Sequence, residues 1–541
     1  MTDITANTAA DKPKDDAVEP KVIKPYTQPR LSKSRIMAGL QCPKRLWLET
    51  YHRELIHYEP SSHSAFAQGD AFGVLARSLI EADCDQVGTL IEAVREPVAA
   101  LTLTQQALAG DPALLFEPAF KADNVFVRAD ALIRESAQSS ALSDEPRYTM
   151  VEVKASASIK ASHVRDCAVQ TWVARACGLN VTRIELAHVD NQFSYSGDGY
   201  QGLLKRVDIT AQIESQLPDV SGWVHTATTT LQSPDTPDVA MGKHCYQPYP
   251  CPFVAHCTAT CPAPAAPAPQ FPITLLPSIQ GKSLAKNLQA QGYEDLLTVP
   301  ADKLGRFAFV QTAYANNQPF FDAQAAKTLL NAQPKPWAYF DFETVSPAIP
   351  LWRDTKPFAH WPFQWSAHVE AANGALAHHD FLDLSGANPA TGCIPAMLAA
   401  TQSAKTIWAY NASFERQAIM RLAAAYPADS VALTQMANKL QDLIPIVQAC
   451  YYHPAMMGSY SIKSVLPAIA PELSYANLDG VKDGNAAQGA FFEAIAVTTP
   501  PERKAEIRAQ LLAYCQLDTW AMVVLVARLL QQELPTLAQP V

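Results

Sequence analysis

The pattern of hydrophobic positions divides the chain into two α/β halves. A helix with a serine cap and an apolar stripe is predicted from Leu31, with an interruption at Cys42–Pro43. A second helical pattern covers residues 65–82. Strands are predicted at residues 124–133, 148–155 and 183–189, with a helix at 163–178 between the last two. This mixed order predicts an α/β domain with a central sheet.

A stretch rich in proline and alanine marks the boundary between the halves. Residues 262–270 consist almost entirely of these two residue types, which predicts a stiff spacer. Short helices are expected up to residue 334, and a second α/β pattern begins at Trp337 with WAYFDFET, WPFQWSAHVE and KTIWAYNA. We therefore expect a disordered tail at 1–30, an α/β domain at 31–262, a small helical linker at 263–334 and a second α/β domain at 335–541.

Length and composition agree with this division. The chain of 541 residues is too long for one hydrophobic core, and its 48% hydrophobic and 17% charged residues are ordinary for a globular protein. No apolar run approaches the roughly 20 residues that span a bilayer. The polar first twenty residues match neither a signal peptide nor a transit peptide. We expect a cytoplasmic protein without a membrane partner.

The net charge of −10 does not exclude nucleic acid as a partner, because the local potential of a groove matters more than the total. The N-terminal segment contains Lys33, Arg35, Lys44 and Arg45. This segment predicts either a local positive patch or an ordinary solvated helix face.

Acidic and basic residues converge in the strands of the first half. Glu152 and Lys154 lie two apart and share one strand face, and Asp130 ends a preceding strand. Two carboxylates and an ammonium at one point suit metal-assisted phosphodiester hydrolysis with Mg²⁺ or Mn²⁺. Glu117 is a candidate third carboxylate. On spacing alone, a solvated strand face is the alternative.

These residues, followed by Gln170 on the next predicted helix, resemble the PD-(D/E)XK core of RecB-like nucleases. The resemblance implies that Asp130 and Glu152 bind metal, that Lys154 assists catalysis, and that Gln170 shapes the site or holds DNA. Many members carry a histidine on the early helix. At that place this sequence offers Gln68, Gly69 and Asp70.

Four of the 11 cysteines crowd into residues 245–261. Disulfides are not expected in a chain without an export signal, so the spacing favours sulfur ligation of zinc or of an iron–sulfur cluster. A local zinc site would use Cys245, Cys251, Cys257 and Cys261. Buried free thiols are the alternative.

A different ligand set follows from a resemblance. Cys42 in CPKRLW and the later cysteine trio resemble RecB-like nucleases of the AddB type and related CRISPR adaptation nucleases. In those proteins one cysteine before the nuclease core and three after it hold a 4Fe–4S cluster. The resemblance implies a structural cluster on Cys42, Cys245, Cys251 and Cys257, with Zn²⁺ as the alternative. Such a cluster would close a loop of about 200 residues.

Acidic residues also mark the second half. Asp341 and Glu343 share one face of a predicted strand, and the phenylalanines beside them take the other. Two carboxylates so close repel each other unless a cation or a proton joins them, which suits a two-metal site. Near the end of the chain, Tyr514 and Asp518 lie four apart on one helix face. A tyrosine there can orient an attacking water.

This constellation resembles the DEDD exonucleases of the RNase-H-like fold, in their tyrosine variant. WAYNASFERQAI supplies the middle motif, with Glu415 where the family commonly has aspartate. The resemblance implies a 3′–5′ exonuclease-like site with Tyr514 as a catalytic residue. Its metal ligands would be Asp341, Glu343, Glu415 and Asp518. Asp442 and Lys463 also match positions of family elements, with helix capping and surface charge as the alternatives.

Together the halves resemble a bacterial family that fuses a RecB-like nuclease to an RNase-H-like exonuclease, with a segment similar to helix-hairpin-helix linkers between them. This resemblance implies a nuclease that hydrolyses phosphodiester bonds of DNA at two sites, with RNA as the alternative substrate, and a helicase or a repair or defence complex as partner. Two other classes stay open. One is a nucleic-acid-binding scaffold with degenerate centres, and the other is a zinc-stabilised interaction protein.

Overall fold

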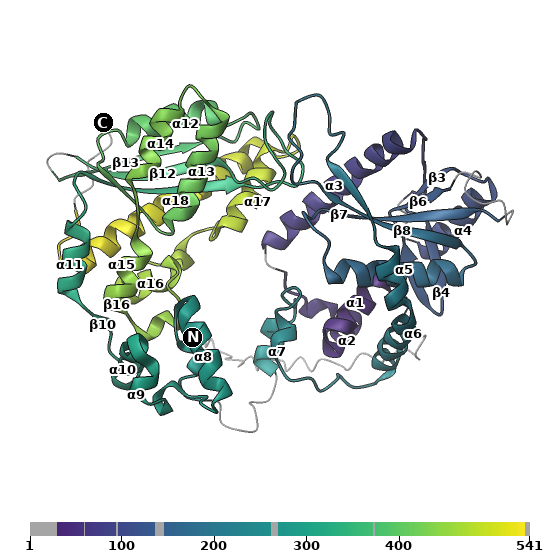
Figure 1. The fold of residues 1–541 in the computed structure, drawn as a ribbon, viewed down its shortest axis with the longest axis horizontal. Coiled ribbons are helices and arrows are strands. Elements are labelled where there is room, and N and C mark those ends of the chain that lie inside the picture. The colour runs from purple at the N-terminus through teal and green to yellow at the C-terminus, as the bar shows by residue number, and fades with distance from the viewer. Residues whose placement is uncertain are drawn as a thin grey trace, which may run out of the picture.

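The computed structural model describes residues 30–58, 60–92, 96–135, 145–260, 269–371 and 374–535, without the side chains of residues 60–65. The chain has an α/β fold, as predicted, and its elements gather into two lobes (Figure 1). The expected tail, apart from Arg30, lies outside the described residues. So do Cys261 and most of the proline–alanine stretch.

A six-stranded mixed sheet forms the centre of the first lobe. Its strands, in spatial order, are β2 (Thr89–Leu90), β3 (Leu114–Phe116), β6 (Ala131–Arg134), β7 (Arg147–Lys154), β8 (Asn180–Val189) and β9 (Leu204–Asp208). β7 and β8 run parallel because α5 (Ala161–Ala176) carries the chain back between them. A smaller sheet contains β1 (Leu31–Ser32), β5 (Val125–Arg128) and β4 (Ala119–Ala122).

The single strand predicted at 124–133 is wrong, because the structure has two strands there. β5 pairs in the small sheet and β6 pairs in the large one, with the break at Ala129 and Asp130. The break turns Asp130 toward the next strand, where its Oδ2 accepts a hydrogen bond of 2.6 Å from the Val153 N–H. Asp130 thereby lies beside β7 instead of within a ladder.

The helices of the first lobe surround these sheets. They are α1 (Lys33–Gln41), α2 (Pro43–Tyr51), α3 (Pro60–Cys84), α4 (Pro97–Ala109), α5, α6 (Thr210–Gln232) and α7 (Val254–Thr260). The predicted interruption at Cys42–Pro43 is confirmed. Cys42 is extended (φ −163°), as expected before a proline, and Pro43 begins α2 at its first position.

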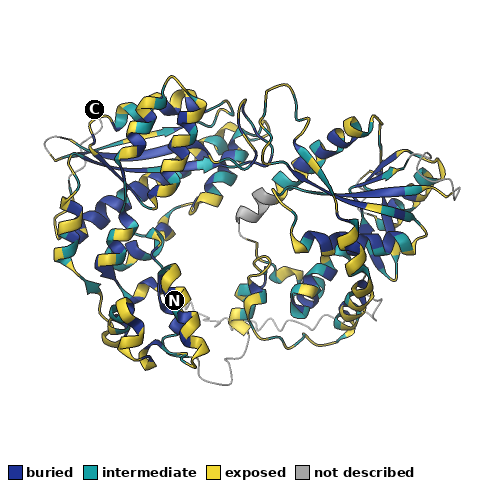
Figure 2. Ribbon diagram, in the orientation of Figure 1, coloured by how far each residue is buried: buried dark blue, intermediate teal, exposed yellow. Residues whose placement is uncertain are grey.

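The second lobe contains a five-stranded sheet. Its order is β13 (Leu376–Leu382), β12 (Trp361–Glu370), β11 (Trp337–Val345), β14 (Thr406–Ala409) and β15 (Leu440–Asp442). The helices that complete this part are α12 (Ala390–Ala400), α13 (Ala412–Ala425), α14 (Ser430–Lys439), α15 (Leu443–Cys450), α16 (Ile462–Ile469), α17 (Gly484–Ile495) and α18 (Pro501–Leu530). Buried strands lie between helical layers in both lobes (Figure 2).

Helix α18 is longer and more apolar than the sequence analysis recognised. By length and composition it could cross a membrane, with a mean hydropathy of 1.3 over its most apolar window. However, 61% of that window is buried inside the lobe, where α18 packs against β11 and β12. The apolar stretch therefore has a core partner within the protein.

The helical segment between the lobes packs onto the second one. It comprises α8 (Ser278–Ala290), α9 (Ala301–Leu304), α10 (Ala308–Asn316), β10 (Phe320–Phe321) and α11 (Ala323–Asn331). β10 pairs with β16 (Tyr451–Tyr452), and Leu330 lies in one hydrophobic cluster with Trp337 and Trp408. Residues 269–334 thus share a core with the second α/β part.

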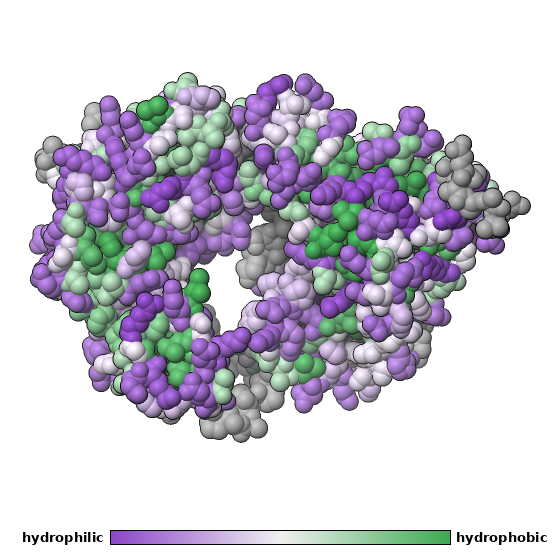
Figure 3. Space-filling model, in the orientation of Figure 1, coloured by the Kyte–Doolittle hydropathy of each residue, from purple (hydrophilic) through white to green (hydrophobic). Residues whose placement is uncertain are grey.

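The two lobes touch along one side of the molecule, and an opening lies between them elsewhere (Figure 3). Helix α3 packs against α17, and Phe72 and Val189 of the first lobe form an apolar cluster with Ala348 of the second. The Tyr200 hydroxyl donates to the Pro350 carbonyl at 3.0 Å. These contacts hold one end of β11 near the first lobe.

We expect Leu330→Ala to destabilise the second lobe by about 2–5 kcal/mol, because a fully buried leucine leaves a cavity. Denaturant unfolding followed by tryptophan fluorescence measures this loss. The matched control is Leu329→Ala, since Leu329 is 41% exposed and its truncation should change stability by at most about 0.5 kcal/mol. Equal effects of the two variants would contradict the shared core.

Candidate functional site

An acidic cavity of about 440 Å³ lies in the second lobe. The residues predicted for the second site all line it: Asp341, Glu343, Glu415, Tyr514 and Asp518. They come from β11, α13 and α18, which are far apart in the sequence. The fold therefore brings the predicted carboxylates together in one place.

Local structure explains how these side chains reach the cavity. Asp341 and Glu343 alternate with Phe340 and Phe342, which belong to the hydrophobic core on the other face of β11. Glu415 lies in the first turn of α13 and is 3% exposed. Its Oε2 atom is buried and makes no hydrogen bond to the described residues, which is unusual for a carboxylate.

Burial dominates the electrostatics of this cavity, and mutual repulsion of the carboxylates adds to it at Asp341 and Glu343. Burial and the nearby Asp518 carboxylate raise the pKa values of Asp341 and Glu343 well above their usual range. Burial also raises the pKa of Glu415 to about 8 and that of Asp518 to about 6. Without a cation the cluster holds protons at pH values where carboxylates are normally ionised. Such a donor set fits divalent cations, which prefer carboxylate oxygens.

Two further polar residues lie beside the acidic cluster, and only one of them was predicted. Lys463 lines it, with its Nζ 5.5 Å from the ring centre of Tyr475 and 5.4 Å from that of Tyr514. Lys463 is half-buried, and its charge lies beside the acidic residues. The Tyr475 hydroxyl donates a 2.6 Å hydrogen bond to Asp518 Oδ1. No spacing in the sequence pointed to Tyr475, because a short 3-10 helix between α16 and α17 brings it to Asp518.

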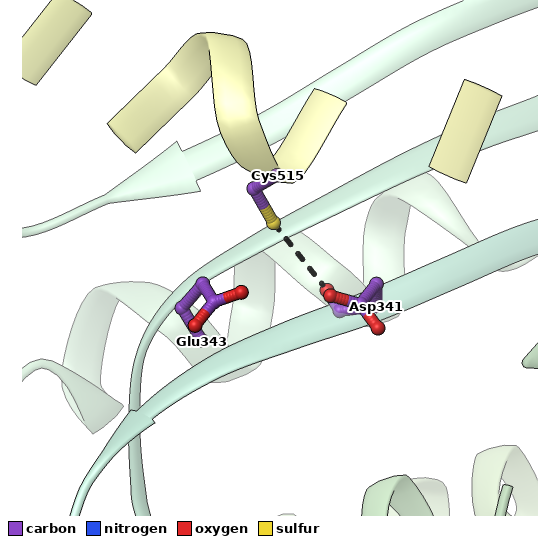
Figure 4. Close-up of side chains that lie close together, drawn as sticks. All are labelled: Asp341, Glu343 and Cys515. Atoms are coloured by element: carbon purple, nitrogen blue, oxygen red, sulfur yellow. Dashed lines mark hydrogen bonds between the residues drawn. The ribbon is translucent and has the colours of Figure 1, made fainter. Parts of the chain in front are cut away.

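Cys515 projects from α18 toward the acidic pair on β11 (Figure 4). Ligand atoms of Asp341, Glu343 and Cys515 lie within 4.8 Å of one another. However, burial raises the pKa of the Cys515 thiol well above its usual value, and the thiol faces the Asp341 backbone carbonyl at 3.9 Å. A protonated thiol is a poor ligand for Mg²⁺ or Mn²⁺. The carboxylates remain the better candidates.

Asp442 acts as a helix cap rather than as a lining residue. Its Oδ1 accepts hydrogen bonds from the Ile444 N–H at 2.9 Å and from the Asn411 N–H at 3.1 Å. The first bond caps α15, and the second holds the residue that precedes α13. Asp442 thus positions the helix that carries Glu415.

The first predicted site also assembles. Lys154 Nζ lies 2.6 Å from Glu152 Oε1, and Gln170 Nε2 donates to Glu152 Oε2 at 2.7 Å. Burial and the neighbouring Glu152 raise the pKa of Asp130 to about 8. Glu152 is 2% exposed, so the alternative of a solvated strand face is wrong.

Two residues in this network, Asp166 and Lys33, were not predicted to be part of the site. Asp166, one turn before Gln170 on α5, accepts a 2.6 Å hydrogen bond from Lys154. Lys33, counted only as part of a basic segment, donates to Glu152 Oε1 at 2.8 Å. The spacing of Asp166 and Gln170 on one helix face is a signal that was available.

Beside this network, Asp130 and Asp70 line a cavity of about 300 Å³. Glu117 lines it too, but its carboxylate lies 3.5 Å from Arg77 and 3.6 Å from Arg128. Gln68 instead lines an apolar cavity between the lobes. Helix α3 therefore contributes the carboxylate of Asp70 to the cavity beside Asp130, at the place where many RecB-like nucleases have a histidine.

Cys42, Cys245, Cys251 and Cys257 all line one small cavity. Gln41 Nε2 holds the end of α1 against this loop through the carbonyls of His244 (2.7 Å) and Tyr249 (2.8 Å). Lys44 and Arg45 line the same cavity, so these cations face the thiols. Cys261 lies outside the described residues.

The thiols are spread more widely than a zinc site requires. Tetrahedral zinc with Zn–S bonds of about 2.3 Å brings its sulfurs within about 3.8 Å of one another. Among the described residues, the compact ligand group within 4.8 Å is the Asp341 cluster, and no three of these four cysteines form another. As they lie, no three of these thiols are close enough together to share one zinc ion.

Comparison with known families adds little about activity. A family model described as a domain of unknown function (DUF2779) matches residues 338–461. The matched segment contains Asp341, Glu343 and Glu415, and it ends before Lys463 and α18. No curated protein matches the chain.

We predict that Mg²⁺ or Mn²⁺ stabilises the second lobe more at about pH 8 than at about pH 5. The raised carboxylate pKa values mean that the folded state binds more protons than the unfolded state between about pH 4 and pH 8, so metal-free stability falls as pH rises. Thermal unfolding with and without metal measures the difference.

The variant Asp341→Asn should lose most of this metal-induced rise in melting temperature, which for a unit of this size is about 2–4 °C per kcal/mol. Asp479→Asn is the control, because Asp479 is an exposed acidic residue that does not line the cavity. A metal effect that is independent of pH, or unchanged in Asp341→Asn, would contradict the assignment.

We predict that anaerobically purified protein is brown and contains iron, and that Cys42→Ser and Cys251→Ser each remove colour and iron. Both thiols line the cysteine cavity. Cys393→Ser is the control, because Cys393 is a buried thiol in the second lobe. Colourless protein with stoichiometric zinc would show that the alternative metal is correct.

Proposed function

We propose that the chain is a metal-dependent nuclease that hydrolyses phosphodiester bonds of DNA, with a RecB-like site in the first lobe and a 3′–5′ exonuclease-like site in the second. The observation that carries the proposal is the convergence of Asp341, Glu343, Glu415 and Asp518 on one cavity. Carboxylates held together at such electrostatic cost need cations, and paired cations suit phosphoryl chemistry.

The side chains around the second site have separable roles in this proposal. Bound divalent cations would supply Lewis acidity and activate water. Burial and Asp518 keep the pKa of Tyr514 far above its usual value, so its hydroxyl stays protonated and can donate a hydrogen bond to a water or phosphate oxygen. Tyr475 fixes the Asp518 carboxylate. Lys463 supplies a positive charge beside the phosphate.

The 4Fe–4S cluster belongs to the same proposal as a structural element. Cys42 lies between α1 and α2, and the other three thiols follow α6. The cluster would tie the first and last parts of the first lobe together. It has no redox step in the reaction.

The second candidate function is a nucleic-acid-binding scaffold whose first site is degenerate. It is favoured by the donors that already surround Glu152, which accepts from Lys33, Lys154 and Gln170. The scaffold reading does not account for the second site, where Glu415 Oε2 has no hydrogen-bond partner among the described residues.

Degradation of end-labelled DNA and RNA with Mg²⁺ or Mn²⁺ tests the proposal. We expect Asp341→Ala to reduce release of nucleotides from the 3′ end by at least about a hundredfold, since it removes a metal ligand. Asp130→Ala should reduce cleavage by the first lobe without affecting that release.

The controls are Asp83→Asn and Asp479→Asn, which remove exposed carboxylates from α3 and from the loop after Tyr475. Both should retain full activity. If neither alanine variant lowers the degradation of any substrate, the nuclease assignment is wrong and the scaffold is the better explanation.

A further inference from the structure

Lys33 makes a contact in the first lobe that the proposed function does not use. Its ammonium lies 2.8 Å from Glu152 Oε1 and 3.5 Å from Asp166 Oδ2. Lys154 contacts the same two atoms at 2.6 Å each. Two ammonium groups therefore bridge the same pair of carboxylates, inside a site where a single catalytic lysine was predicted.

The bonds to Glu152 leave its Oε1 atom fully engaged. A carboxylate oxygen offers two lone pairs, and Oε1 already accepts from Lys33 and Lys154. Oε2 accepts from Gln170, and the side chain is 3% exposed. A divalent cation that binds Glu152 through Oε1 must replace one of the two ammonium groups.

The positions of Lys33 and Lys154 in the fold indicate which of the two ammonium groups a cation would displace from Glu152. Lys154 is fixed on the central strand β7 and is hydrogen-bonded to Asp166 as well as to Glu152. Lys33 begins helix α1, outside the large sheet, and reaches Glu152 through a long, flexible side chain. Asp166 lies 3.5 Å from Lys33 and can become its hydrogen-bond partner after a small rotation.

We propose that Lys33 is an exchangeable counterion of the first site: it neutralises Glu152 in the metal-free protein and passes to Asp166 when a divalent cation binds. The proposal rests on the metal site of the proposed function. It makes Asp166 a positioning residue, because it receives the displaced ammonium. It also means that the first site binds divalent cations more weakly than the second, where one lysine faces four carboxylates.

The test measures Mn²⁺ binding by calorimetry to the full chain, with the second site removed by Asp341→Asn and Glu343→Gln. In this background we expect Lys33→Met to lower the Kd for Mn²⁺ about tenfold, because the competing charge is gone. Lys33→Gln should reproduce the effect, and Lys33→Arg should leave the Kd near that of the parent. Asp166→Asn should raise the Kd several-fold, since the displaced lysine loses its partner.

Lys160→Met is the matched control. Lys160 is an exposed lysine just before α5 and makes no hydrogen bond or ion pair with Glu152. If Lys160→Met tightens Mn²⁺ binding as much as Lys33→Met, general electrostatics explains the result and the exchange is wrong. An unchanged or higher Kd in Lys33→Met would overturn it as well.

Failure of the inference can be told apart from failure of the proposed function. Asp130→Asn in the same background should abolish Mn²⁺ binding if the first lobe holds a metal site. If Asp130→Asn and the parent bind Mn²⁺ equally, the metal site itself is misassigned. If Asp130→Asn abolishes binding while the Lys33 variants leave the Kd unchanged, only the exchange is wrong.

Discussion

The burial of Asp341, Glu343, Glu415 and Asp518 around one cavity is the constraint around which the second lobe is organised. The four carboxylates are held by three rigid elements, β11, α13 and α18, so the group cannot relax by moving apart. β11 is the central strand of its sheet, and α18 is buried along most of its apolar length. Lys463 lowers the pKa values of three of the four, but one ammonium cannot balance four carboxylates. Protons or cations must supply the remaining positive charge, and this requirement connects the fold to metal-dependent chemistry.

The first lobe meets a similar problem in a different way. Glu152 is as deeply buried as Glu343, yet burial is outweighed by Lys33 and Lys154, which lower its pKa below the usual value. The protein itself therefore supplies the countercharge at this site. The contrast between the lobes follows from what surrounds each carboxylate, since the carboxylates are equally removed from water. This difference in neighbouring charges means that the second site needs cations to balance its carboxylates, whereas lysines already balance Glu152 in the first site.

Much of both sites could be predicted from local periodicity. Alternation along β11 places Asp341 and Glu343 on one face, and helical spacing pairs Tyr514 with Asp518. Two of the residues that were missed, Tyr475 and Lys33, reach their sites from elsewhere in the chain. Tyr475 begins a short 3-10 helix 43 positions before Asp518, and Lys33 lies 119 positions from Glu152, so no spacing rule connects either residue to its partner. The break at Asp130 was missed for a related reason: an apolar run does not reveal that its two halves pair with different sheets.

Helix α1 links the cysteine cavity to the first acidic site. Lys33 is its first residue and Cys42 follows its last, so about 13 Å of helix separates the two. Gln41 fastens the Cys42 end to the loop that carries the other thiols. A centre bound there would fix the position of α1 and thereby the reach of Lys33 toward Glu152. The structural role proposed for the iron–sulfur cluster therefore extends to the charge balance around Glu152. Helix α1, which the cluster would hold in place, also carries Lys33, the second lysine that contacts Glu152.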